Sequence, residues 1–225
     1  GGGIDLIFPH HENEIAQSEA AFPEKGDFVK YWMHNGMVEV KEEKMSKSKG
    51  LKDDWILRNL LKKFDSDIIK LYILSTHYRS PLEFSQNKLN EAKKAYEKIL
   101  NFLRNVSFLA DINKSKISSV KISFKADSFA SDSDVNNFDI EPDEISEKIY
   151  IFKKSFKSEF KMAMDDDFNS AKAIGILFDF IGNVNAIIQD RKFKINASIA
   201  NSLKITFNLV NEYGRIFGFD FKDNL

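Results

Sequence analysis

The chain has no cysteine among its 225 residues, so it forms no disulfide and offers no thiolate ligand of its own. It also lacks a charge of one sign. Lysine and arginine total 33 against 34 aspartate and glutamate residues, and the net charge is −1. No global basic field therefore draws nucleic acid to the chain, and any RNA contact must come from local patches. We find no signal peptide and no apolar run near the roughly 18 residues of a membrane helix, so we predict a cytoplasmic protein without a membrane partner.

The composition is that of a folded protein. It is 43% hydrophobic, 30% charged and 13% aromatic, with 21 phenylalanines. A chain of this length forms one large domain or two small ones with a sizeable core.

The first part of the sequence mixes short strand and helix patterns. Residues 6–8 are apolar and lie between glycines and Pro9, which predicts a short strand with a helix after it. Ile15, Ala16 and Ala20 give that helix an apolar face. We expect a further strand at Met37–Val40 and helical segments between residues 55 and 74.

From residue 85 the pattern becomes helical. Ser85 is a candidate cap for a long helix. Between residues 127 and 144 lie seven acidic residues and no basic one, which predicts a mobile insertion. Three apolar stripes at three-four spacing predict a helical bundle over residues 85–225: Leu89, Ala92, Tyr96, Ile99, Leu103 and Val106; Ala173, Leu177, Phe180, Ile181, Val184, Ile187 and Ile188; Leu203, Phe207 and Val210.

A lysine-serine segment runs from Lys44 to Ser48. Lysine is a compact charge on a long stem, so Lys44 and Lys47 suit contacts with a triphosphate whose charge develops during reaction. The alternative is a solvated surface loop, because Glu39, Glu42 and Glu43 alternate with lysines.

His10 and Glu14 lie four residues apart, so on a helix their side chains share one face and could reach a single zinc ion. Two ligands do not make a zinc site, and a helix start is the alternative. Upstream, Gly1–Gly3 allows close approach of the backbone to a nucleotide, and Asp5 could accept two ribose hydroxyls; an ordinary tight turn is the alternative. The aspartates 165–167 fit the start of a helix capped by Asn169 or Ser170.

In combination these segments resemble part of a known active site. Gly1–Asp5, Phe8–Glu14, Trp32–Val38, Lys44–Ser48 and His77–Ser80 follow the order found in the second half of class I aminoacyl-tRNA synthetase active sites, and most closely in cysteinyl-tRNA synthetases. The resemblance implies an α/β fold over residues 1–84, the end of a Rossmann-like catalytic domain. An all-α, tRNA-binding helical bundle then follows over residues 85–225.

The resemblance also implies roles for residues. His10 and Glu14 become ligands of one Zn²⁺, with two further ligands outside this chain, and His11 lines the pocket. Lys44 and Lys47 become catalytic, with Lys47 on the ATP phosphates and Mg²⁺ accompanying ATP. Asp5 and His34 become nucleotide contacts, although a partly buried structural role suits His34 equally.

The implied reaction joins L-cysteine to tRNA(Cys) at the expense of ATP, in a protein we expect to be a monomer. No His-x-Gly-His motif occurs among the four histidines, so we expect the isolated 225-residue chain to be inactive. Two alternatives stay open. One is a related ATP-dependent cysteine ligase with an amino-sugar acceptor, as in mycothiol synthesis, and the other is a non-catalytic tRNA-binding fragment.

Overall fold

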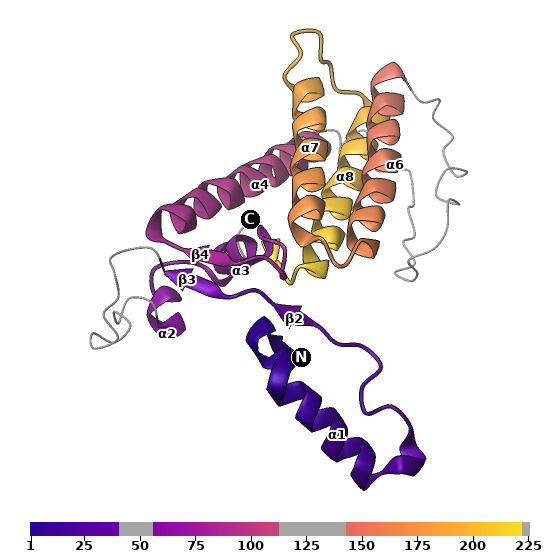
Figure 1. Ribbon diagram of the computed structural model, residues 1–225. Coiled ribbons are helices and arrows are strands. Elements are labelled where there is room, and N and C mark those ends of the chain that lie inside the picture. Colours follow the sequence, from indigo (N-terminus) through magenta and orange to yellow (C-terminus); the bar gives the residue numbers. More distant parts are fainter. Residues whose placement is uncertain (41–55, 113–142, 222–225) are drawn as a thin grey trace. The chain divides into compact units, whose positions relative to one another are not determined.

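The computed structural model describes residues 1–40, 56–112 and 143–221 (Figure 1). By their contacts these residues form two compact units. The first comprises Gly1–Lys94 with Ala163–Ile174, and the second comprises Ala95–Met162 with Gly175–Leu225. The boundary predicted at residue 84 separates a catalytic part from a helical bundle, whereas these two units are defined by contacts. That boundary therefore stays a prediction.

The first unit begins with short elements around a small sheet. Strand β1 pairs in parallel with strand β2, with Gly2 opposite His34. The prediction of a strand at residues 6–8 is wrong. The ladder ends at Gly3 because β2 is only two residues long, and the chain then turns tightly. The elements are β1 (Gly2–Gly3), the short helices η1 (Ile4–Leu6) and η2 (Ile7–His11), helix α1 (Glu12–Ala21), the turn η3 (Pro23–Lys25) and β2 (His34–Asn35).

Helix α1 confirms the prediction of a helix after Pro9. Glu12 and Glu14 lie in its first turn, where carboxylates favour the positive end of the helix dipole. None of its residues is buried, and its apolar face is at most half-buried at Ile15.

A second small sheet and two helices complete most of the first unit. Strand β3 (Val38–Val40) pairs in parallel with strand β4 (Leu82–Phe84), which confirms the strand predicted at Met37–Val40. Helices α2 (Leu57–Leu60) and α3 (Ser66–Leu74) confirm the helical pattern between residues 55 and 74.

The predicted bundle is present in four long helices. They are α4 (Gln86–Ile112), α6 (Glu144–Asp165), α7 (Ser170–Ile188) and α8 (Ala197–Ile216), and α6, α7 and α8 lie side by side in Figure 1. Ser85 caps α4 as predicted, because its Oγ accepts a hydrogen bond from the Lys88 amide at 3.4 Å. The first stripe is buried at all six positions, whereas Ile187, Ile188 and Phe207 of the other two are only half-buried.

Aromatic rings form much of the core of the second unit. Phe156 lies 4.8 Å from Phe180 and 4.9 Å from Tyr213 between ring centroids. At the end of the described chain Phe219 and Phe221 are buried beside Tyr96. These contacts explain part of the high phenylalanine content.

The structure corrects two further predictions. The predicted mobile insertion does not extend to residue 144. Asp143 caps α6 through the Ser146 amide at 2.8 Å and Glu144 begins the helix, while residues 127–142 lie outside the described residues. The second correction concerns the prediction that no apolar segment approaches the length of a membrane helix. Helix α7 has 19 residues, and an 18-residue stretch of it has a mean hydropathy of 1.5, enough by length and composition to cross a membrane. However, its Leu177, Phe180 and Val184 are buried in the second unit, and a core helix of a soluble protein passes the same test.

Candidate functional site

The glycine run brings β1 against the segment that carries His34. The Gly2 amide donates to the Met33 carbonyl at 3.2 Å, and a Cβ at Gly1 would overlap that same carbonyl. A side chain at Gly1 would therefore push the two segments apart, whereas a Cβ at Gly2 would meet the Leu6 side chain. Asp5 lies just beyond, exposed in η1, with its carboxylate against Gly3. Its role toward a ribose stays a prediction.

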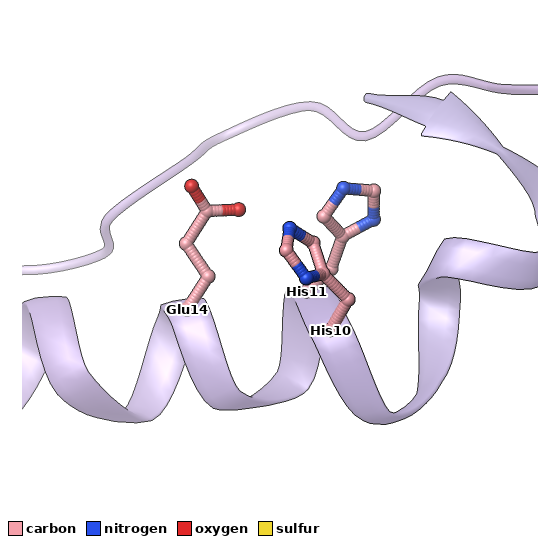
Figure 2. A group of neighbouring side chains, drawn as sticks. All are labelled: His10, His11 and Glu14. Carbon is pink, nitrogen blue, oxygen red and sulfur yellow. The ribbon is translucent and has the colours of Figure 1, made fainter.

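Three potential metal ligands gather at the start of α1. One donor atom from each of His10, His11 and Glu14 lies within 4.8 Å of the others. Figure 2 shows all three side chains rising from the same side of the helix. His11 is buried, whereas His10 and Glu14 are exposed. The structure thus brings the predicted pair together and adds His11 to it.

His11 is held from behind by the next strand. Its Nδ1 lies 2.8 Å from Nε2 of His34, so one of these nitrogens donates a hydrogen bond to the other. Trp32 stacks on His34 at 5.8 Å between centroids, with the rings 7° apart. Burial lowers the pKa of His11, and the neighbouring imidazole of His34 adds to the effect. This histidine pair was not anticipated from the sequence, because it joins residues 23 positions apart.

The donor set suits zinc. Imidazole nitrogen and carboxylate oxygen are ordinary zinc ligands, and the described residues supply three such groups in reach of one another. His10 and Glu14 are the exposed donors of the group, whereas His11 is buried.

The remaining predicted positions concern phosphate and RNA contacts. Lys44 and Lys47 lie outside the described residues. Arg79, in the segment His77–Ser80, donates hydrogen bonds to Asp167 through Nε and Nη2. The sequence does not predict that pairing, because 88 residues separate its partners.

Comparisons with known proteins define the class. Residues 1–94 match the family described as tRNA synthetases class I (C) catalytic domain, and residues 159–222 match the DALR domain. Residues 1–94 thus match part of a class I tRNA synthetase, and the predicted order of a class I catalytic part followed by a helical domain is confirmed.

Curated relatives narrow the class to one kind of protein. A protein of Carboxydothermus hydrogenoformans named Cysteine--tRNA ligase is 40% identical over 221 residues, which is 98% of this chain and 39% of the relative. Proteins of the same name from Desulforamulus reducens and Geobacter sp. strain M21 are 38% and 42% identical over 218 and 185 residues. These cover 97% and 82% of this chain and 39% and 33% of the relatives. The chain thus spans about two fifths of the length of the first two relatives.

Proposed function

We propose that the protein carrying this chain is a cysteine–tRNA ligase. It would activate L-cysteine with ATP to cysteinyl adenylate and pyrophosphate, then transfer the cysteinyl group to the terminal ribose of tRNA(Cys). The observation that carries the proposal is the alignment of 98% of the chain with a cysteine–tRNA ligase at 40% identity.

The group at the start of α1 gives the proposal its chemistry. We assign His10 and Glu14 as ligands of one Zn²⁺, on the grounds that their donors converge and are exposed. When bound, zinc supplies a thiophilic centre that favours a thiolate over the hydroxyl of serine. His34 fixes the orientation of His11 beside that centre through the 2.8 Å contact between the two rings. A site whose selectivity depends on the bond between zinc and the substrate thiolate rejects serine without a second editing site.

The remaining assignments concern ATP and tRNA. Lys47, with Lys44 beside it, is proposed to contact the phosphates of Mg²⁺-bound ATP, where an ammonium group stabilises charge that develops on pyrophosphate. Asp5 and His34 are proposed to line the nucleotide pocket. The helices matched by the DALR domain are proposed to contact tRNA(Cys). We expect a cytoplasmic monomer.

The test is cysteine-dependent exchange of ATP with pyrophosphate by the purified protein, followed by charging of tRNA(Cys). We expect exchange with cysteine, very little with serine, and transfer to tRNA. Exchange with cysteine but transfer only to an amino sugar would move the protein to the alternative ligase class. Binding of tRNA without any exchange would leave only the non-catalytic alternative.

A further inference from the structure

A turn in the first unit is held by a side chain from far along the sequence. The turn is His77–Ser80, and the side chain is Asp167. Asp167 accepts a hydrogen bond from Tyr78 Oη at 2.7 Å and bonds from Nε and Nη2 of Arg79, the latter at 3.1 Å. The bond from Arg79, followed by that from Tyr78, lowers the pKa of Asp167 to about 2. The carboxylate is therefore ionised at any physiological pH.

The corner that presents Asp167 has an unusual backbone. Asp167 and Phe168 have φ values of 54° and 53°, in the left-handed region that residues other than glycine rarely adopt. Ser170 anchors the corner a second time, because its Oγ donates to the Leu74 carbonyl at 2.8 Å. Strained conformations persist only where their surroundings fix them, so these bonds give the corner a defined position within the first unit.

The His77–Ser80 turn and the residues after it also hold the segment Trp32–Met37 through backbone hydrogen bonds. The Gly36 amide donates to the Tyr78 carbonyl at 2.7 Å, and the Leu82 amide donates to the Met37 carbonyl at 2.9 Å. Gly36 is buried, and a Cβ there would overlap the Ser80 carbonyl. Backbone packed this closely cannot shift unless the turn shifts with it.

The same segment places His34 against His11. A continuous series of contacts therefore joins Asp167 to Tyr78, Tyr78 to Gly36, and the strand before Gly36 to the His34–His11 pair. Asp167 lies in the part of the sequence matched by the DALR domain, whereas the other members lie in the part matched by the catalytic domain.

We propose that Asp167 is a positioning residue for the histidine–carboxylate group, acting through the His77–Ser80 turn on His34 and thereby on His11. The proposal rests on the proposed function, since it takes this group to be the site that binds cysteine. It adds that the DALR-matched part of the chain sets the affinity of that site.

A spectroscopic experiment tests the positioning directly. The chain has two tryptophans, Trp32 and Trp55, so Trp55→Phe leaves Trp32 as the reporter stacked on His34. In that background Asp167→Asn should shift the emission maximum of Trp32. The matched control is Asp166→Asn, which makes the same charge change at the exposed neighbouring position and should leave the emission unchanged. An unshifted spectrum in Asp167→Asn overturns the proposal.

A kinetic experiment then tests the consequence. In the protein carrying this chain, Asp167→Asn should raise KM for cysteine in pyrophosphate exchange about threefold to tenfold, the loss expected for one hydrogen-bonded contact. Combined with His34→Asn, the effect of Asp167→Asn on KM should largely disappear, because both variants disturb the same contact. Fully additive effects would show that Asp167 does not act through His34.

A second variant covers the case in which Asp167→Asn does not fold. Tyr78→Phe removes only the hydroxyl bond to Asp167 and should produce the same shift of Trp32 emission in a smaller size. If Tyr78→Phe leaves the emission unchanged, the proposal is wrong. Absence of cysteine-dependent exchange in the unaltered protein would instead refute the proposed function, while the Trp32 measurements would still decide the positioning.

Discussion

At the scale of single residues, the proposed site depends on two exposed donors and one buried histidine. His10 and Glu14 face the same point, and His11 is fixed by His34. A hydrogen-bonded partner of this kind holds the ring orientation and tautomer of a histidine beside a metal site. The His34–His11 contact therefore matters even where His34 touches no substrate.

We predict that His10→Ala in the intact protein lowers zinc affinity by at least about tenfold, because losing a ligand costs no less than losing its supporting partner. Discrimination between cysteine and serine should collapse with it. Glu14→Ala should act in the same direction but more mildly, since the carboxylate is the least thiophilic donor of the group. Zinc affinity by chelator competition and the cysteine-to-serine exchange ratio are the measurements. The control is Glu12→Ala, an exposed glutamate in the same turn, and full zinc affinity in His10→Ala would reduce the group to an ordinary helix start.

Lys47→Ala is predicted to act on rate rather than on binding. An ammonium group that meets charge developing on the phosphates stabilises the transition state more than the ground state. We expect the rate of cysteine activation to fall about 10²-fold or more, with little change in cysteine affinity. Single-turnover adenylate formation measures both quantities. A variant that keeps its rate and loses only cysteine affinity contradicts the assignment.

The contacts around the candidate site differ in how far the sequence predicts them. The approach of His10 to Glu14 follows from helical spacing and could be predicted. The His34–His11 and Arg79–Asp167 contacts could not, because each joins segments that only the tertiary fold brings together.

At the scale of secondary-structure elements, periodicity predicted the long helices well where one face is fully buried. The six stripe positions of α4 are all buried, as expected. Helix α6 was missed, although Ile149, Phe156, Phe160 and Ala163 form a buried stripe of their own. In the sequence this stripe follows directly on the acidic residues 127–144, which obscure where the helix begins. The strand predicted at residues 6–8 is absent, because an apolar run of three residues shows no period and its pairing partner decides its structure.

Capping residues give the element scale its own prediction. Asn196 caps α8 by accepting the Ile199 amide at 2.8 Å, and its amide group also donates to Asp143, the cap of α6. We expect Asn196→Ala to lower the free energy of unfolding by about 1–2 kcal/mol, the cost of a lost cap. Urea unfolding followed by circular dichroism measures it. The matched control is Asn183→Ala at an exposed position inside α7, which should be neutral or slightly stabilising because alanine is the better helix former. Equal losses in the two variants would rule out the capping role.

At the scale of the whole molecule, burial is unevenly distributed. The buried apolar side chains come mainly from α3, α4, α6, α7, α8 and the residues just after α8, whereas no residue of α1 is buried. Of the candidate metal ligands, Glu14 lies on this exposed helix and His10 lies just before it. Local stability follows buried apolar contact, so this region should open more easily than the bundle.

Hydrogen exchange on the 225-residue chain tests that expectation. Amides of α1 should exchange at least about tenfold faster than those of α4 between Leu89 and Val106, because local opening of α1 exposes little buried surface. In the intact protein, where the two further ligands are present, zinc bound to His10 and Glu14 would link the first turn of α1 to the preceding turn, so added zinc should slow exchange near the start of α1 and leave the bundle unchanged. Peptide-resolved exchange with and without zinc, repeated on Glu14→Ala, separates the two effects. Protection of α1 equal to that of α4 without metal would contradict the burial argument, and slowing that persists in Glu14→Ala would remove Glu14 from the ligand set.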